Sequence, residues 1–391
     1  MNTQSPIDED LKIKWKRIQC LQKEQNVDAC LISSFVNIYY LTGKIFDGYI
    51  YLPNEGEPIY FVRKPVALED ERAIHIYKPE DISSLLKDKN VDLPKTIGLE
   101  ADQLTHNEYL RLEAVFNPEK VVNATAILRW SRMLKTPWEI DQFRYSAERH
   151  NDVYGKISSL FKPGMTDLEF QYEIERIIRQ HGSIGVFRAF GSNMDIFMGS
   201  LLTGDNAETP SPCDFALGGG GCHACLPIGA NGSSIKKGQS VMVDMAGNFT
   251  AYITDMTRVF SYGTLPDIAY QAHQVSIDMH QWLMEVGKSG ISCSSIYSQS
   301  LEMAKNAGLS NFFMGTKQQA KFVGHGVGIE INELPVLTGR SKDLLQTGMV
   351  FAYEPKFVLP GIGAVGVENT YLVTETGLEK LTIFEEAIIN L

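Results

Sequence analysis

The sequence contains no apolar run of about 18 residues, the length that a bilayer-spanning helix needs, so no transmembrane segment is expected. Its first residues, MNTQSPIDEDLKIKWK, are polar and charged, and they lack the apolar stretch of a secretory signal. Six cysteines in 391 residues are few, which favours free thiols in the cytoplasm over a disulfide framework. Basic charge is not in excess either: the net charge of −11 argues against nucleic acid and anionic membranes as partners.

Two common local motifs are also missing. The glycine run 218–221 is not followed by the Lys-Ser/Thr pair of a phosphate-binding loop, so we expect no nucleotide site there. Cys222 and Cys225 form a single Cys-x-x-Cys motif without a second pair, which disfavours a zinc or redox site. The composition is that of an ordinary globular protein, 44% hydrophobic and 21% charged, and the length suffices for two domains.

Helical and strand patterns alternate in the first third of the chain, which is typical of an α/β layer domain. Short apolar strand-like runs are separated by helical stretches and by Pro, Gly and charged turns. The strands are expected at 29–32, 49–52, 59–62, 74–77 and 97–99, and the helices at 8–28, 79–86 and 106–116. Because this region has no paired carboxylates and no clustered histidines, we interpret it as an accessory domain.

A domain boundary is predicted at Lys135–Glu139. Thr136 suits the N-cap of a helix, Pro137 its first position and Glu139 the third position of a capping box. The same capping pattern recurs from Thr166 to Glu169, before another helical stripe. We therefore expect an accessory domain at residues 1–135 and a second domain at 136–391.

The stretch Gln239–Phe260 predicts a β-hairpin with one aspartate on each strand, Asp244 and Asp255. A turn centred near Phe249–Thr250 would place the two aspartates directly opposite each other. Two carboxylates on one apolar face repel unless they share a proton or a cation. The alternative, surface acids that each pair with a lysine, fits the apolar surroundings less well.

A second hairpin, about Met349 to Thr374, repeats this arrangement. Glu354 and Glu368 are equidistant from the expected turn at Gly361. Between the two hairpins, His325 stands within the glycine-rich segment FVGHGVGI, where little blocks approach to its ring.

Together these residues form a candidate metal site with four carboxylates and one imidazole: Asp244, Asp255, His325, Glu354 and Glu368. Oxygen ligands with one nitrogen suit Mn²⁺, Fe²⁺, Co²⁺ or Zn²⁺. Four carboxylates are neutralised by about two divalent ions, and two ions about 3.5–4 Å apart can share a bridging water that attacks a carbonyl. The predicted reaction is hydrolysis of an amide or a related C–N bond.

The segments VMVDMAG, ITDMTRVF, GHGVGIEINELP, YEP and GVENTYLVTE resemble the pita-bread metallopeptidase family, which includes Xaa-Pro dipeptidase, Xaa-Pro aminopeptidase and the creatinase-like branch. Residues 17–43 are similar to the N-terminal domain of its two-domain members. The resemblance implies an α+β chain with a C-terminal pita-bread catalytic domain, a smaller N-terminal α/β domain and a homodimer. It also implies two divalent ions, Mn²⁺ or Co²⁺ before Zn²⁺ or Fe²⁺.

The resemblance also implies roles for the ligands. Asp244 would bind one ion, Asp255 and Glu368 would bridge, and His325 and Glu354 would complete the site. Glu354 would in addition pass a proton between the bridging water and the leaving amine, as a catalytic residue.

Three positions depart from the hydrolytic members. Ile228 stands where they carry a histidine after Leu-Pro, Asn332 replaces a second histidine seven residues after His325, and Gly366 replaces an arginine of the dipeptidase branch. Asn332 retains a hydrogen-bond donor for a carbonyl oxygen but cannot protonate it. His223, in the glycine-rich loop, is a candidate catalytic substitute; the alternative is a solvent-facing loop histidine.

The leading hypothesis is therefore a cytoplasmic, metal-dependent peptidase resembling Xaa-Pro dipeptidase or aminopeptidase, acting on small peptides. The second is a non-peptidase enzyme on the same scaffold, a creatinase-like C–N hydrolase or a lyase on a small zwitterion, which the three departures favour. The third, a catalytically silent binding protein, is disfavoured because clustered acids in an apolar setting are costly without a metal.

Overall fold

The computed structural model describes residues 6–186, 188–191, 198–213 and 215–391. It divides into two compact units near the expected boundary. One comprises residues 1–132 and 136–138, and the other comprises 133–135 and 139–391. None of the helices in the described ranges is long and apolar enough to cross a membrane.

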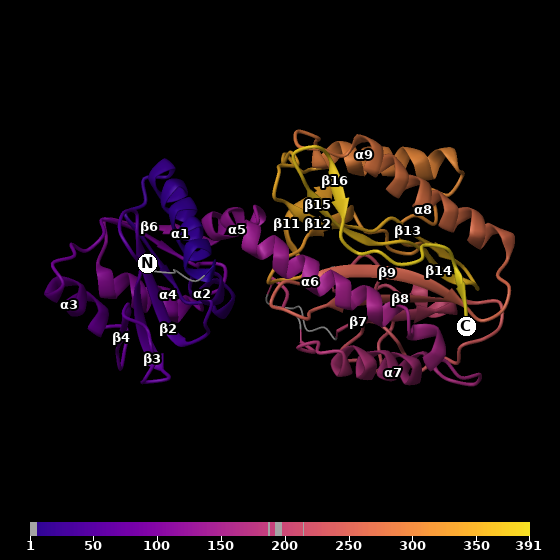
Figure 1. Ribbon diagram of the computed structural model, residues 1–391, viewed down its shortest axis with the longest axis horizontal. Coiled ribbons are helices and arrows are strands. Elements are labelled where there is room, and N and C mark those ends of the chain that lie inside the picture. The colour runs from indigo at the N-terminus through magenta and orange to yellow at the C-terminus, as the bar shows by residue number, and fades with distance from the viewer. Residues whose placement is uncertain (1–5, 187, 192–197, 214) are drawn as a thin grey trace. The chain divides into compact units, whose positions relative to one another are not determined.

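The N-terminal unit is built on a six-stranded mixed sheet with strand order β4-β3-β2-β1-β5-β6 (Figure 1). Strand β1 pairs antiparallel with β2 and parallel with β5, the mixture that alternating helices and strands produce. The strands are β1 Ala29–Ile32, β2 Asp47–Pro53, β3 Ile59–Lys64, β4 Ala73–His75, β5 Thr96–Leu99 and β6 Lys120–Asn123. The helices are α1 Pro6–Glu24, α2 Phe35–Thr42, α3 Asp81–Asp88, α4 His106–Phe116 and α5 Thr125–Met133.

A fully buried glutamate, Glu100, follows β5 in this unit and joins it to the start of α2. Its Oε2 accepts hydrogen bonds from the backbone N–H groups of Ser33 and Ser34. Its Oε1 accepts from the Ser34 hydroxyl and from the Asn37 amide, both at 2.6 Å. A carboxylate at a helix N-terminus is favoured by the helix dipole, and here donors from the protein satisfy both oxygens.

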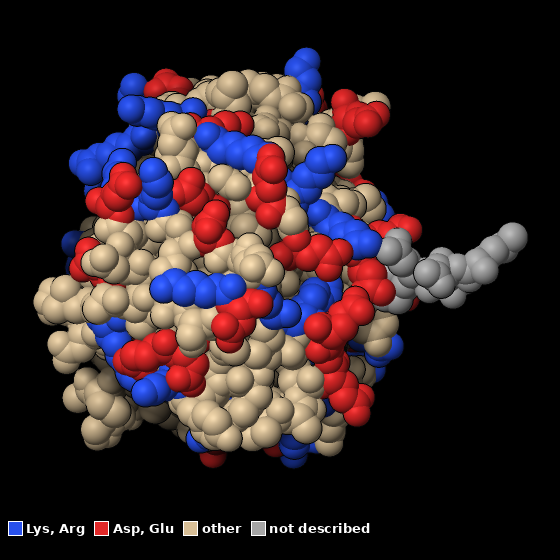
Figure 2. Space-filling view, turned by 90° about the vertical axis from the view of Figure 1, so that its left-hand side faces the viewer, with Lys and Arg blue, Asp and Glu red and all other residues tan. Residues whose placement is uncertain are grey.

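Acidic and basic side chains are interspersed over the face of the molecule shown in Figure 2. Charges of both signs on one face are typical of an ordinary solvated surface.

The C-terminal unit contains three sheets and four α-helices in its described part. The first sheet has the order β17-β9-β8-β7, the second β11-β10-β12-β15-β16, and β13 pairs with β14 alone. The strands are β7 Gly199–Thr203, β8 Ser240–Gly247, β9 Thr254–Ser261, β10 Phe322–Gly326, β11 Glu333–Thr338, β12 Val350–Tyr353, β13 Lys356–Leu359, β14 Gly363–Gly366, β15 Asn369–Val373, β16 Leu378–Lys380 and β17 Ile389–Asn390. The helices are α6 Pro137–Tyr154, α7 Asp167–Gln180, α8 Asp267–Val286 and α9 Cys293–Asn306, with short 3-10 turns at Ile157–Leu160 and Gly204–Glu208.

Helices cover the sheets of this unit on two sides (Figure 1). Apolar residues of α6 and α7, such as Tyr154 and Phe170, pack on β7, β8 and β9. A second core joins α8 and α9, with Met279 and Ile296, to the strands of the second sheet and to β13 and β14. The predicted capping box of α7 is present, since Thr166 and Glu169 exchange side-chain and backbone hydrogen bonds. The strands of this unit therefore contact an apolar core on each side.

The register of the first hairpin differs from the sequence prediction. Asp244 on β8 lies opposite Thr257, and Asp255 on β9 lies opposite Ala246. The turn is centred one residue later than expected, and a shift of one residue in the turn moves every partner by two. Because side chains alternate with a period of two, both aspartates still share one face, as diagonal rather than direct neighbours. The prediction of directly opposed aspartates was therefore wrong, whereas the shared face is observed.

The second hairpin turns about Gly361, as predicted. Lys356 pairs with Gly366 and Tyr353 pairs with Asn369, so Glu354 and Glu368 lie level with each other. Both glutamates fall in the short interruptions between β12 and β13 and between β14 and β15. The hairpin is therefore broken where its two acids emerge.

Candidate metal centre

The structure brings together the five residues predicted as metal ligands. Asp244 and Asp255 come from the first hairpin, His325 from β10, and Glu354 and Glu368 from the breaks in the second. Their atoms form two overlapping groups, Asp255–His325–Glu368 and Asp244–Glu354–Glu368, and within each group the ligand atoms lie within 4.8 Å of one another. The arrangement has two sides that share Glu368.

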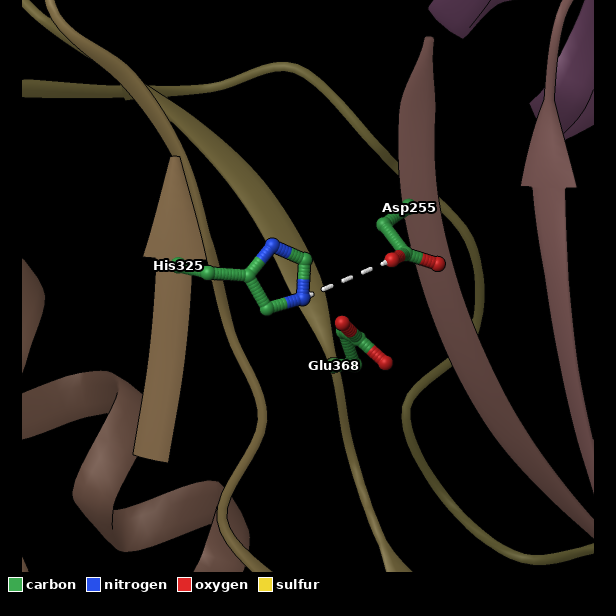
Figure 3. Close-up of side chains that lie close together, drawn as sticks. All are labelled: Asp255, His325 and Glu368. Atoms are coloured by element: carbon green, nitrogen blue, oxygen red, sulfur yellow. Dashed lines mark ion pairs between the residues drawn. The ribbon is translucent and has the colours of Figure 1, made fainter. Parts of the chain in front are cut away.

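On the His325 side of the centre, the side chains of Asp255, His325 and Glu368 point toward one another (Figure 3). His325 Nε2 lies 3.9 Å from Asp255 Oδ2 and 3.6 Å from Glu354 Oε1. The other ring nitrogen, Nδ1, lies 3.2 Å from the carbonyl oxygen of Gly326; donation there leaves a lone pair on Nε2. Glu368 Oε1 is buried and has no hydrogen-bond partner among the residues that the structure describes. Buried carboxylate oxygens are normally paired, so this side fits a cation.

The Asp244 side of the centre is filled by an ammonium group that the sequence reasoning missed. Lys356 Nζ lies 2.8 Å from Asp244 Oδ2, 2.8 Å from Glu354 Oε2 and 2.9 Å from Glu368 Oε2. Its side chain is fully buried. An ammonium group has three protons, and each of them has a carboxylate acceptor here.

The electrostatics of the two sides follow from burial and from their neighbours. Burial raises the pKa of Asp244 to about 6, and Lys356 opposes that rise. Burial and the carboxylates of Glu368 and Asp244 raise the pKa of Asp255 well above its usual value. Burial alone lowers the pKa of a lysine, but the three acids outweigh it and raise the pKa of Lys356. In the metal-free protein the acids are thus short of positive charge.

Helix α8 holds the two breaks that carry the glutamates. Ser276 donates a hydrogen bond to the carbonyl oxygen of Pro355, directly after Glu354, and accepts one from the N–H of Val367. His280 lies 2.9 Å, through Nε2, from the carbonyl oxygen of Val367. One helix therefore fixes the backbone on both sides of the glutamate pair.

Arg258, on β9, supports the same region from the first sheet. Its guanidinium is fully buried and donates to the carbonyl oxygens of Thr257 and Glu368 and to the side-chain oxygen of Asn369. The Thr257 hydroxyl donates to Glu368 Oε2 at 2.7 Å. These contacts fix both the backbone and the carboxylate of Glu368.

The structure does not bring His223 to the ligand cluster. The residue is exposed, and its Nδ1 lies 3.0 Å from the sulfur of Cys225 and accepts from the Cys225 N–H. Ile228, in the position of the family histidine, is buried. A catalytic role for His223 stays a prediction from the sequence.

The side-chain amide of Asn332 is hydrogen-bonded to both backbone groups of Phe190. Its oxygen accepts from the N–H of Phe190 at 2.6 Å, and its nitrogen donates to the carbonyl oxygen of Phe190 at 2.9 Å. The neighbouring Ile331 N–H donates to the carbonyl oxygen of Arg188. Asn332 and Ile331 therefore hold residues 188–190 next to the start of β11.

One sequence signal for Lys356 was available. The segment that follows Glu354-Pro355 reads Lys-Phe-Val-Leu, and all four residues are buried on β13. A single lysine that begins an apolar strand, two residues after a predicted ligand, needs a buried acid as a partner. Pairing of the acids with lysine was the alternative expected at the surface, whereas the structure shows such pairing in the interior.

Comparisons with known proteins place this centre in a family. Residues 141–375, more than half of the chain, match the model of metallopeptidase family M24, and residues 14–134 match the creatinase/prolidase N-terminal domain. The chain therefore belongs to metallopeptidase family M24, as the motifs predicted.

Relatives and solved structures extend this over nearly the whole length. The chain is 22% identical to Xaa-Pro dipeptidase of Pyrococcus furiosus over 97% of its own length and 100% of the relative. It is 25% identical to an uncharacterized peptidase of Staphylococcus aureus strain USA300, covering 93% of the chain and 96% of the relative. The structure of Xaa-Pro dipeptidase from Bacillus anthracis superposes with a TM-score of 0.80 at 21% identity, covering 97% and 100% of the two chains. The expected pita-bread fold is thus confirmed.

Proposed function

We propose that this protein is a metal-dependent hydrolase of small peptides, of the Xaa-Pro dipeptidase or aminopeptidase class. The observation that carries the proposal is the His325 side of the centre, where Asp255, His325, Glu354 and Glu368 converge and a buried Glu368 oxygen has no partner in the described structure. Relatives named as dipeptidases and peptidases match along almost the entire chain, which favours a peptidase over the non-peptidase alternative.

The residues on the His325 side would hold the ion. Three carboxylates and one imidazole match the preference of Mn²⁺ and Co²⁺, the ions we propose first. When bound, the ion would act as a Lewis acid that polarises a peptide carbonyl, and it would lower the pKa of water so that a nucleophile is available at neutral pH.

Glu354 is positioned to move the proton in this reaction. One of its oxygens is held by Lys356, and the other faces His325 Nε2 at 3.6 Å. A carboxylate in this place can take a proton from the attacking water and pass it to the amine as the C–N bond breaks. The proton then leaves with the amine product, and the carboxylate is restored.

Substrate recognition differs from that of the hydrolytic relatives in three places. Ile228 offers no donor, Gly366 has no side chain for a substrate carboxylate, and the Asn332 amide contacts the backbone of Phe190. His223 is the proposed replacement for a missing histidine, and its exposed loop is the element that would have to approach the substrate. A cytoplasmic location fits the six free cysteines. Dimerisation stays a prediction from the family resemblance.

The test is hydrolysis of Xaa-Pro dipeptides and Xaa-Pro-Yaa tripeptides by protein loaded with Mn²⁺ or Co²⁺. We expect turnover, with a loss of about 100-fold or more in Glu354→Gln, which keeps the side-chain volume but cannot accept a proton. Preference for dipeptides or tripeptides would name the subclass. Metal-loaded protein that cleaves neither series would reject the proposal and direct the search to non-peptide amides.

A further inference from the structure

Lys356 occupies the space between the three carboxylates that a second metal ion would need. Its Nζ lies 2.8–2.9 Å from one oxygen each of Asp244, Glu354 and Glu368. A first-row metal ion binds carboxylate oxygens at about 2.0–2.2 Å, so an ion shared by the same three oxygens would lie almost where the ammonium nitrogen does. The two cations exclude each other by volume and by charge.

We propose that Lys356 replaces the second divalent cation, so that this member of the family works with a single metal ion. The ion would be held on the His325 side, by Asp255, His325, Glu354 and Glu368. The inference deepens the proposed function, since it rests on the same metal site. It replaces the two-ion site expected from the sequence.

The charges of the cluster agree with one ion. Four carboxylates meet one ammonium group, and one divalent ion leaves a single negative charge on the set. Two divalent ions beside the buried ammonium would make the set positive and place three cations within a few ångströms of one another, where a low dielectric screens repulsion poorly.

Moving the ammonium group of Lys356 out of the carboxylate cluster would be unfavourable. Its side chain is fully buried, and the next residues of β13, Phe357 and Val358, belong to the apolar core between the sheet and α8. Moving the ammonium out of the carboxylate cluster would put an unpaired charge among apolar groups, which costs several kcal/mol. The three acids therefore fix the ammonium in place.

Gly366 pairs with Lys356 across β13 and β14, and its surroundings agree with the proposed replacement of a metal ion by the lysine. A Cβ atom at position 366 would lie 2.6 Å from the carbonyl oxygen of Pro355, 2.8 Å from Lys356 Cα and 3.4 Å from Lys356 Cγ. Its φ of +137° also disfavours any other residue. The position where the dipeptidase branch carries a basic residue is thus empty, and a basic residue enters the centre from the opposite strand.

The exchange has a consequence for Glu354. Lys356 holds Glu354 Oε2, so the side chain is oriented with Oε1 towards His325. In a two-ion centre a metal would fix that carboxylate. Here we assign this positioning role to the lysine.

The first measurement is the number of ions per chain. Full-length protein is loaded with excess Mn²⁺, desalted and analysed by inductively coupled plasma mass spectrometry. We expect one Mn²⁺ per wild-type chain and two in Lys356→Ala, which opens the second position. Electron paramagnetic resonance should show an isolated ion in the wild type and the broadening of two coupled ions about 4 Å apart in the variant.

A matched control is Lys135→Ala. Lys135 is also a buried lysine of the C-terminal unit, and its Nζ lies 3.2 Å from Oε2 of Glu333, an acid that is not one of the candidate ligands. Its loss should destabilise the fold and leave one ion per chain. This separates a specific effect of Lys356 from the general effect of removing a buried charge.

The outcomes separate the inference from the proposed function. Two ions per wild-type chain would overturn the inference and leave the proposed function standing. This measurement tests the inference even if Lys356→Ala does not fold. No bound ion would overturn both. One ion in the wild type with no peptide cleavage would support the inference and reject the function. A folded Lys356→Ala that still binds one ion would count against the lysine as the substitute cation.

Discussion

Two glutamates are buried to the same extent, one in each unit, and their surroundings are opposite. Glu100 is fully buried, and donors from the protein reach both of its oxygens. Glu368 is 1% exposed, and its Oε1 has no partner in the described part of the chain. The first acid joins two elements of the N-terminal unit, whereas the second has donors on Oε2 alone, from Lys356 and Thr257, and its Oε1 is open to a metal ion. Whether both oxygens of a buried acid have hydrogen-bond donors, more than how deeply it is buried, therefore distinguishes a structural acid from a candidate ligand.

Isosteric substitution of the two glutamates tests this comparison most strongly. Glu368→Gln removes one negative ligand from the centre, and we expect Mn²⁺ affinity to fall by at least about 100-fold, more than the loss of a residue that only supports a ligand. Glu100→Gln should bind Mn²⁺ with wild-type affinity. Isothermal titration calorimetry on both variants measures this, and equal losses would break the comparison.

The stabilities should show the reverse order. In Glu100→Gln the new NH₂ group faces existing donors, and we expect a loss of about 3 kcal/mol in the N-terminal unit. Amide hydrogen exchange at Ser33 and Ser34, read in the full chain, localises that loss. Metal-free Glu368→Gln should be at least as stable as the metal-free wild type, because one of four repelling charges is gone. A large destabilisation there would mean that Glu368 is structural.

A pair of glycines in the second hairpin sharpens the comparison at smaller scale. Gly366 and Gly361 both have positive φ, +137° and +75°, but a Cβ at 366 meets backbone atoms while a Cβ at 361 meets nothing within 4 Å. We expect Gly366→Ala to cost about 2–3 kcal/mol and Gly361→Ala about 1 kcal/mol. Thermal unfolding of the metal-free proteins provides the measurement. Equal costs would remove the argument that the packing around Lys356 requires glycine at 366.

A buried histidine shows a limit to this comparison. A buried polar atom that lacks a hydrogen-bond partner but carries no charge does not need a cation. His150 is fully buried, its Nδ1 lies 3.0 Å from the Thr254 hydroxyl, and its Nε2 has no partner among the described residues. Burial and the charge of Arg258 lower the pKa of His150 to about 3. Between pH 6.5 and 3 the unfolded chain therefore binds a proton that the folded chain does not, and stability falls as the pH falls.

The slope attributable to one such histidine is at most about 1.4 kcal/mol per pH unit. His150→Phe keeps a ring in the core and does not titrate, so its stability should fall less steeply between pH 6 and 4. Chemical denaturation across that range measures the difference. Identical slopes in the two proteins would show that His150 is not neutral in the folded state.

The elements that were predictable share one property, a periodic pattern with an end signal. The capping box at Thr166 and the turn about Gly361 were read correctly because local chemistry determines both. The first hairpin shows the limit, since a one-residue error in the turn misplaced the partner of each aspartate. It preserved the face because the strand period is two, so Asp244 and Asp255 were still assigned to one site.

The remaining features depend on contacts between distant segments. Lys356 was missed because its role requires three acids that the fold brings to one point. The contact between Asn332 and Phe190 joins segments that no local pattern connects, so the sequence suggested a substrate as the partner of the amide. The five candidate ligands were predicted from motif spacing, whereas the number of cations they would share depends on a side chain outside those motifs.

The grip of α8 on the breaks in the second hairpin bears on the order in which the chain folds. The N–H groups of Glu354 and Glu368 donate to carbonyl oxygens of neighbouring strands, and Ser276 and His280 of the helix bind the backbone beside the two glutamates. Docking of α8 therefore completes the positioning of the two glutamates, and we expect it late, after the sheets have formed. Substitutions on this face of α8 should then accelerate unfolding more than they slow folding. The repulsion between the carboxylates would then arise only after the other contacts of the domain have formed and can offset it.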